Sequence, residues 1–278
     1  MVHIIIDTTA GLPRDLTRKL GIPVVPQYVI FGEKSYRDDS ELDTQTFLKL
    51  LKQSKQLPKT AAPSPELYKP YFHQAADKGE SVVVITPSEK VSGTYNSAMA
   101  ARDDFKSADI RVIDSRTIAG NLGTLSLLAH ELAQSEKTAD EIESKIKELI
   151  PRGRTYFLID TLEYLQKGGR IGSARALLGE LLQVKPILQI KDGQVAPFDQ
   201  ERTKKRALSK LVEIVTEQVK VSSEPHLCVM HVEAQEDAKA LADTLSSNLK
   251  ISDIPIYELP PAIVVHAGPK TLAVGFFA

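Results

Sequence analysis

The first half of the chain alternates short apolar runs with segments of helical periodicity, and this alternation restricts the fold more than any other feature. The runs HIIID, SVVVITP and IRVIDS are each followed by a helical pattern, as in LPRDLTRKLG and GTLSLLAHELAQSE. Strands that alternate with helices in this way form a mostly parallel sheet flanked by helices. The sequence therefore predicts an N-terminal α/β domain over residues 1–153.

The pattern changes after Pro151 and Gly153. RTYFLI reads as a strand, and KPILQIKDGQVAPFDQ reads as an antiparallel hairpin because Asp192-Gly193 is a strong turn signal. ARALLGELLQ, TKKRALSKLVEIVTEQVK and AQEDAKALADTLSSNL have helical patterns, and we expect a final hairpin through His266-Ala267-Gly268-Pro269 into TLAVGFFA. These segments predict a second domain of α+β type with a mixed or antiparallel sheet, over residues 154–278.

Composition excludes several classes of protein. Lys and Arg number 35 against 36 Asp and Glu, so no overall basic field favours nucleic acid. The N-terminus lacks the pattern of a signal peptide and no apolar run is long enough to cross a membrane, so we expect a cytoplasmic protein. The single cysteine, Cys228, excludes a disulfide framework and a cysteine-based metal site. No nucleotide-binding motif is present, and we expect neither a cofactor nor a metal.

Five loops rich in small or polar residues stand at strand ends. They are Asp7-Thr8-Thr9, the segment from Lys59 to Ser64 that contains Thr60, Ser92-Gly93-Thr94, Asp114-Ser115-Arg116, and Val265 to Pro269. Loops that leave the carboxyl ends of parallel strands gather at one edge of a sheet, where ligands bind. A helix that begins near Gly93 would offer unpaired N–H groups and a positive dipole end to an anion. The alternative is that Ser92 only caps this helix.

Two further side chains have competing interpretations. His266 is the residue most suited to titrate near this edge, or it is a structural histidine that bonds a backbone carbonyl. Arg170 follows Gly168-Gly169, which we expect to end a helix over TLEYLQK. It would then be an exposed cation with no particular role, or one that contacts the acidic surface of a partner.

Taken together, these segments resemble the DegV family of bacterial lipid-binding proteins. The similarity rests on Asp7-Thr8-Thr9, the Thr60 segment, Ser92-Gly93-Thr94-Tyr95-Asn96-Ser97-Ala98, and the closing His266-Ala267-Gly268-Pro269. It is also carried by Lys167-Gly168-Gly169-Arg170-Ile171 and Lys185-Pro186-Ile187-Leu188, so it spans the chain in order. Ala61 and Ala62 depart from the family, which often has polar residues there.

The resemblance implies that one long-chain fatty acid is buried in a tunnel between the two domains. Its carboxylate would lie near Thr60, Ser92, Gly93, Thr94 and His266. The chain would then be the FakB-type subunit of bacterial fatty-acid kinase, which is not itself an enzyme. It would present the carboxylate to a separate ATP-dependent kinase subunit, through contacts that include Arg170, and exchange lipid at the membrane surface. The acyl phosphate formed would serve phospholipid synthesis.

An alternative function is a stand-alone hydrolase or acyltransferase. In that case Ser92 would be the nucleophile and His266 the base. The sequence shows no acidic residue to orient the histidine and no nucleophile-elbow motif. The fatty acid's length and unsaturation, the tunnel-lining residues and the oligomeric state do not follow from the sequence.

Overall fold

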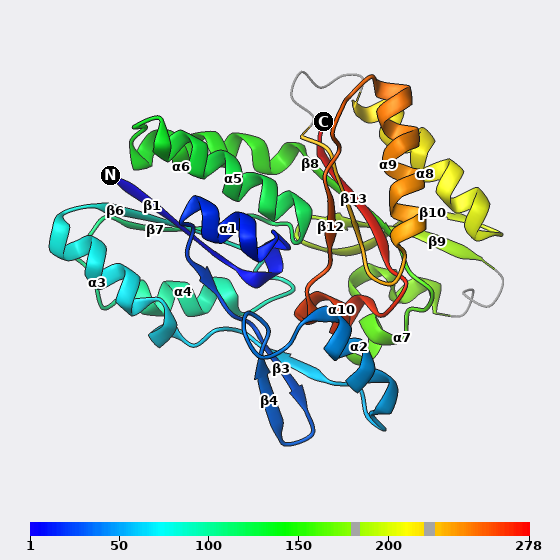
Figure 1. Cartoon of the computed structure of the whole chain (residues 1–278), viewed down its shortest axis with the longest axis horizontal. Coiled ribbons are helices and arrows are strands. Elements are labelled where there is room, and N and C mark those ends of the chain that lie inside the picture. The colour runs from blue at the N-terminus through cyan, green and yellow to red at the C-terminus, as the bar shows by residue number, and fades with distance from the viewer. Residues whose placement is uncertain (179–183, 220–225) are drawn as a thin grey trace.

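The computed structural model describes residues 1–178, 184–219 and 226–278, and in these ranges the strands form three sheets (Figure 1). The first sheet has the strand order β2-β1-β6-β7. Each neighbouring pair in it is parallel, which confirms the predicted parallel sheet. Its strands are β1 (Val2–Asp7), β2 (Val24–Val25), β6 (Ser81–Thr86) and β7 (Ile110–Asp114).

Helices cover both faces of this sheet, as Figure 1 shows. Alternate residues of β1 point to opposite faces, so Ile4 and Ile6 pack in one core cluster and Ile5 in another. Helices α5 and α6 cover the first of these faces and α3 and α4 the second. The helices next to this sheet are α1 (Arg14–Leu20), α3 (Lys69–Lys78), α4 (Thr94–Arg102), α5 (Gly120–Gln134) and α6 (Ala139–Leu149).

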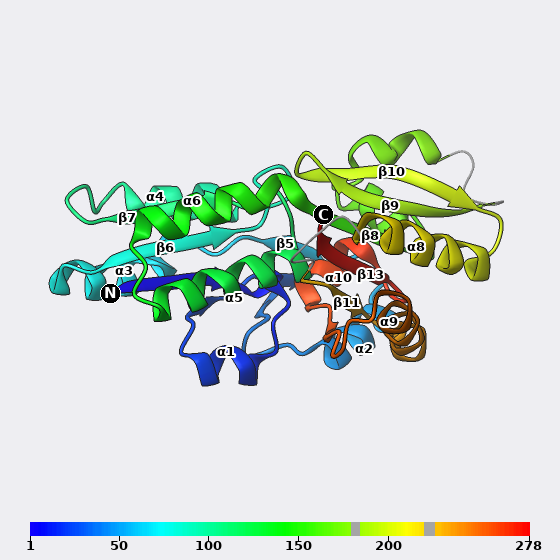
Figure 2. The ribbon, with the colours of Figure 1, turned by 90° about the horizontal axis from the view of Figure 1, so that it is seen from above.

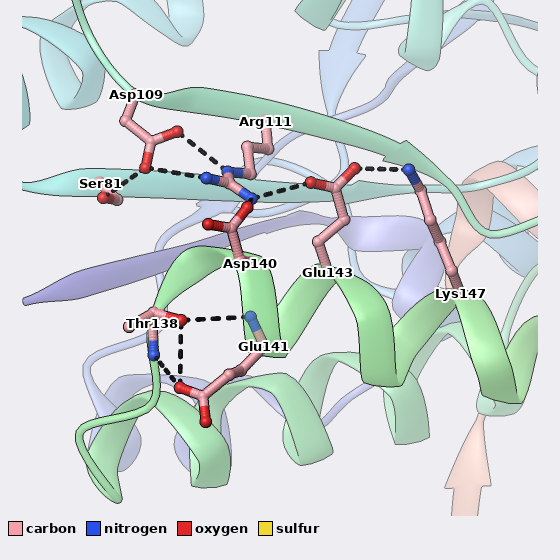
Figure 3. A network of polar contacts seen from close by, with 8 residues as sticks. All are labelled: Ser81, Asp109, Arg111, Thr138, Asp140, Glu141, Glu143 and Lys147. Carbon is pink, nitrogen blue, oxygen red and sulfur yellow. Dashed lines mark hydrogen bonds and ion pairs between the residues drawn. The ribbon is translucent and has the colours of Figure 1, made fainter.

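Polar contacts fix α6 against the edge strand β7 (Figure 3). Thr138 and Glu141 form the capping box that the sequence predicts at the start of α6. Arg111 of β7 pairs with Asp140 at 2.6 Å and with Glu143 at 3.0 Å, both on α6. The helix that covers the edge of the sheet is therefore held by ion pairs as well as by apolar packing.

A small antiparallel sheet, ordered β4-β3-β5, was not anticipated from the sequence. It projects below the parallel sheet in Figure 1, next to helix α2. Its strands have three or four residues each, too few to show a clear period. These elements are β3 (Tyr28–Phe31), β4 (Lys34–Arg37), β5 (Lys59–Ala61) and α2 (Thr44–Gln53).

The third sheet takes all its strands from Gly153 onward, in the order β10-β9-β8-β13-β11-β12. The pair β11 and β12 is parallel and the other pairs are antiparallel, which confirms a mixed sheet and the hairpin at Asp192-Gly193. The strands are β8 (Gly153–Leu158), β9 (Lys185–Lys191), β10 (Gln194–Glu201), β11 (Cys228–His231), β12 (Ile256–Glu258) and β13 (Leu272–Phe277). The division into two domains at residue 153 stays a prediction.

Helices α8 (Lys204–Val219) and α9 (Gln235–Leu249) pack on one face of the mixed sheet. The other face carries α7 (Glu163–Lys167) and α10 (Pro261–Ala267). On that face a shared core cluster joins Val29 and Phe47 from the first half of the chain to Phe157, Val265 and Ala273 from the second. In Figure 2 the parallel sheet and the mixed sheet lie next to each other along the long axis.

Short turns of 3-10 helix connect several elements, and one of them replaces part of a predicted helix. They are Thr8–Ala10, Pro65–Leu67, Ile150–Arg152 and Gly172–Leu177. The helix expected over ARALLGELLQ is 3-10 helix up to Leu177, and its residues 179–183 lie outside the described ranges. In the part of the chain that is described, none of the helices has the length and hydrophobicity of a membrane-crossing segment.

Candidate functional site

The contact between Thr60 and His266 joins two segments that are 206 positions apart. Thr60 is the middle residue of β5, and it pairs with Val29 of β3. His266 lies near the end of α10. The two side chains meet at 2.8 Å, between Thr60 Oγ1 and His266 Nε2. The structure thus brings together two of the residues that the sequence proposed for one site.

The predicted location of His266 in a hairpin was wrong, because residues Pro261–Ala267 form helix α10. Pro261 occupies the first turn, where a missing N–H costs nothing. Gly268 ends the helix with φ +80° and donates its N–H to the carbonyl of Val264. A run of a few apolar residues cannot be assigned to a strand or a buried helix by periodicity alone.

His266 is neutral at physiological pH in this environment. Burial, together with the charge of Arg170, lowers the pKa of His266 to about 4. Its Nδ1 is buried and makes no hydrogen bond to the described residues, and a Cβ at Gly168 would lie 2.3 Å from it. Unpaired buried N–H groups are rarer than under-satisfied acceptors. We therefore assign the proton to Nε2, which donates to Thr60 Oγ1 and leaves the Thr60 hydroxyl free to donate to a ligand.

Ser92, Gly93 and Thr94 lie at the start of α4, as predicted. Gly93 is exposed and occupies the N-cap position, and a Cβ there would lie 3.5 Å from Ala62 Cβ. Ser92 Oγ lies 2.8 Å from Thr94 Oγ1 and accepts the Thr94 N–H at 3.3 Å. Ser92 therefore does satisfy one amide of the first turn. The short distance between a Cβ at Gly93 and Ala62 Cβ shows that the start of α4 lies next to the Thr60 segment.

A buried carboxyl group lies behind Thr94. Asp7 ends β1, and its Oδ2 accepts from Thr94 Oγ1 at 3.2 Å and from Gln27 Nε2. Gln27 Nε2 also donates to Thr94 Oγ1 at 2.7 Å. Thr9 donates its amide and its hydroxyl to Asp7 Oδ1. Burial raises the pKa of Asp7 to about 6, although these hydrogen bonds act in the opposite direction.

A second buried carboxyl group, Asp38, lies close to the first. It accepts the Thr8 hydroxyl at 2.8 Å and the backbone N–H of Gln27 at 2.9 Å. Burial and the neighbouring Asp7 raise the pKa of Asp38 to about 7. Sequence reasoning noted the Asp7-Thr8-Thr9 loop but missed Gln27 and Asp38. Gln27 follows Pro26 between two short strands, where no local pattern marks it.

Arg170 is not the exposed cation that the sequence predicted. Its side chain is half-buried and donates from Nε to the Val91 carbonyl at 3.0 Å and from a terminal nitrogen to the Gly168 carbonyl at 2.7 Å. These bonds tie the loop before Ser92 to the end of α7. Gly168-Gly169 does end that helix, as predicted.

The loop Asp114-Ser115-Arg116 contacts the β9–β10 turn, where Arg116 pairs with Asp192 at 2.9 Å.

An apolar cavity of about 90 Å³ lies beside these residues, on the face of the mixed sheet that carries α10. His266 and Arg170 form part of its wall, together with Thr155 and Thr271, and the remaining lining residues are apolar. Such a space suits a ligand with an apolar body and one polar end. Its apolar lining includes Val91, Phe157, Leu165, Ile190, Val195 and Ile263.

Known proteins share both the sequence pattern and the architecture. The family model described as "Uncharacterised protein, DegV family" matches residues 1–278. A DegV domain-containing protein of Clostridium perfringens is 34% identical, over 99% of this chain and 98% of its own length. The fold and site define an α/β protein in which a parallel sheet adjoins a mixed sheet, with an apolar cavity at the junction. The chain belongs to the DegV family.

Solved structures of the family superpose closely on this chain. A fatty-acid-binding DegV family protein of Thermus thermophilus has a TM-score of 0.94 at 28% identity, with 100% of this chain and 99% of that chain covered. DegV of Bacillus subtilis, described as a fatty acid binding protein, has a TM-score of 0.87 at 31% identity, with coverage of 100% and 99%. The predicted fold class and family are thereby confirmed.

Proposed function

We propose that this protein binds one long-chain fatty acid, with its tail in the apolar cavity and its carboxylate near Thr60, Ser92 and His266. The observation that carries the proposal is the cavity itself, whose mostly apolar wall includes His266 and Arg170. The solved relatives described as fatty-acid-binding support the choice of ligand. We further propose that the ligand lies between the two predicted domains, 1–153 and 154–278.

Three groups are suited to hold the carboxylate: the hydroxyl groups of Thr60 and Ser92, and the start of α4 at Gly93. The Thr60 hydroxyl can donate because His266 occupies its acceptor side. Ser92 and the exposed Gly93 stand at the N-terminus of α4, where the helix dipole favours an anion. Thr94 is fully buried behind Ser92 and donates its amide to Ser92 Oγ, so it acts on the carboxylate only through Ser92. A charge-assisted hydrogen bond of this kind contributes about 1.5–3 kcal/mol.

The tail supplies most of the binding free energy. About fourteen methylene groups at about 0.8 kcal/mol each give on the order of 11 kcal/mol before ordering costs. The tail would make this apolar contact with the cavity wall, which includes Phe157, Leu165 and Val195 of the shared core cluster.

The acid would next be phosphorylated by a separate ATP-dependent fatty-acid kinase subunit. A carrier needs its head group near the surface, and the half-buried Ser92 and exposed Gly93 meet this requirement. Arg170, which we propose to contact the kinase, also donates two hydrogen bonds to backbone carbonyls. Replacing it would therefore also loosen the loop before Ser92. Transient contact with a membrane surface is part of the same proposal.

The geometry does not favour the alternative of a Ser92–His266 hydrolase. His266 Nε2 contacts Thr60, and Ser92 Oγ contacts Thr94. A histidine with a pKa of about 4 is a weak base at pH 7. Its Nδ1 meets no carboxylate among the described residues, so no third group orients the ring.

Mass spectrometry of protein purified from a bacterial host tests the proposal. Under native conditions we expect a mass increase of one fatty acid per chain, and denaturing extraction should release it. A chain that carries no lipid and binds none when fatty acids are added would refute the proposal.

A matched pair of variants separates the cavity from general stability. Ala262 lines the cavity and Ala242 lies on α9, and each is 5% exposed. Enlarging either to Leu should cost about 1–3 kcal/mol of stability by overpacking. Ala262→Leu should also reduce lipid occupancy, whereas Ala242→Leu should not. Equal occupancy in the two variants would place the tail elsewhere.

A further inference from the structure

We propose that Asp7 is a positioning residue that determines, through Thr94, whether the Ser92 hydroxyl can donate to a bound carboxylate. The inference deepens the proposed function and rests on it. Asp7, Thr94 and Ser92 form a chain of hydrogen bonds that leads from the interior to the start of α4.

The hydrogen atoms in this series of hydrogen bonds can be counted when Asp7 is ionised. A hydroxyl group has one hydrogen to donate and two lone pairs. Thr94 Oγ1 gives its hydrogen to Asp7 and accepts one from Gln27 Nε2. Its remaining lone pair faces Ser92 Oγ at 2.8 Å, so the hydrogen of that bond comes from Ser92. Ser92 then has no hydrogen left for a ligand.

The direction of donation along these hydrogen bonds reverses when Asp7 is protonated. The proton on Asp7 Oδ2 is donated to Thr94 Oγ1, which still accepts from Gln27. Thr94 now donates to Ser92 Oγ, and Ser92 also accepts the Thr94 amide. Both lone pairs of Ser92 are then used, and its hydrogen is free for an anion. A carboxylate near Ser92 is therefore bound more tightly when Asp7 carries a proton.

The surroundings allow Asp7 to change its protonation state. Asp7 and Asp38 both line a groove of about 470 Å³ that also includes Arg14, and this groove gives protons a route from solvent. The titratable groups close to Asp7 include Asp38 and Tyr68, and the charge of Asp7 raises the pKa of both. Arg14 donates to the backbone carbonyl of Asp38. Burial raises the pKa of Asp7 to about 6 and lowers that of His266 to about 4, so Asp7 titrates between pH 5 and 8 while His266 stays neutral. Asp38, with a pKa of about 7, titrates in the same range, and its replacement by Asn separates the two carboxyl groups.

The test uses two probes whose head groups do not titrate in this range, dodecanesulfonate and dodecanol. Their Kd values are measured from pH 5 to pH 8 by displacement of a fluorescent fatty acid, which meets no tryptophan background because the chain has none. We expect the Kd of dodecanesulfonate to be about tenfold lower at pH 5 than at pH 8, as one charge-assisted hydrogen bond would give. The Kd of dodecanol should change less than about twofold, because an alcohol can donate as well as accept.

Variants distinguish the hydrogen-bond chain from simple charge repulsion. Asp7→Asn should abolish the pH dependence, whereas the matched control Asp38→Asn should keep it. Ser92→Ala should weaken dodecanesulfonate binding and remove most of the pH dependence. Thr94→Val, which frees the Ser92 hydroxyl at every pH, serves as the second variant if Asp7→Asn does not fold.

The two proposals fail in different ways. A pH-independent Kd in the unmodified protein, or a pH dependence of full size in Ser92→Ala, would overturn the role of Asp7 while the protein still binds lipid. If neither dodecanesulfonate nor any fatty acid binds at any pH, the proposed function itself is wrong.

Discussion

Replacing Gly168 with alanine should disturb the ligand site by moving His266. The new Cβ would lie 2.3 Å from His266 Nδ1 and 2.9 Å from the Tyr164 carbonyl, whereas ordinary contacts begin at 3.4 Å. The imidazole ring would have to retreat by about 1 Å. Its 2.8 Å hydrogen bond to Thr60 would then break, because hydrogen bonds do not extend that far.

The expected loss of stability in Gly168→Ala follows from the broken hydrogen bond and from the overpacking at the new Cβ. A lost neutral hydrogen bond costs about 0.5–1.5 kcal/mol, and overpacking adds about 1–3 kcal/mol. We therefore expect the free energy of unfolding to fall by about 2–4 kcal/mol. If His266 holds Thr60 in place for the carboxylate, the Kd for a fatty acid should rise by about tenfold, which corresponds to about 1.4 kcal/mol.

Gly169→Ala is the matched control for this change. A Cβ at Gly169 meets nothing within 4 Å, but the residue has φ +71°, so alanine there is strained. The variant should lose about 1–2 kcal/mol of stability without a change in Kd. Both variants are assayed by chemical denaturation and by displacement of a fluorescent fatty acid. An unchanged Kd in Gly168→Ala, or an equal change in both variants, would refute the reasoning.

Three further predictions concern stability, measured by chemical denaturation. The folded-state pKa of Asp38, about 7, is above its ordinary value of 3.8, so this group destabilises the fold as pH rises from about 4 to 7. The free energy of unfolding of Asp38→Asn should therefore be higher than that of the unmodified protein by about 1–3 kcal/mol at pH 8 and by little at pH 4. An equal gain at both pH values would contradict this cause. Asn121→Ala should cost about 2–4 kcal/mol, because Asn121 on α5 donates to the Arg154 carbonyl at 2.8 Å and so joins the two halves of the chain. The control Ser126→Ala on the same helix should cost less than about 1 kcal/mol. Similar losses in the two variants would show that Asn121 does not join the halves. Arg111→Ala should cost about 1 kcal/mol at low salt and less in about 1 M salt, and a salt-independent loss would show that its ion pairs contribute nothing.

Much of the fold follows from local signals in the sequence. The runs that became β1, β6 and β7 are apolar along most of their length because both faces of the parallel sheet are covered. The capping box of Thr138 marks the start of α6, and Asp192-Gly193 marks the hairpin. Helix α10 escaped prediction because its short apolar run is buried and carries no period that separates helix from strand.

The site was predictable in its parts but not in its connections. Polar loops at strand ends identified Thr60, Ser92 and His266 as candidates, and the topology rule placed the first-half loops at one edge. The bond from Thr60 to His266 depends on how β5 packs against α10, which only the tertiary structure fixes. Gln27 was missed for the same reason, since its amide reaches Thr94 across 67 positions.

The shared core cluster has a consequence for the life of the protein in the cell. Phe157, Leu165 and Val195 belong both to this cluster and to the cavity wall, so the residues that fold the chain are those that would touch the tail. A ligand that binds only the folded form stabilises it by RT ln(1 + [L]/Kd), about 2.7 kcal/mol at a hundredfold excess over Kd. Loaded molecules would therefore resist proteases better than empty ones. Under this proposal, the supply of fatty acid sets the lifetime of its own carrier.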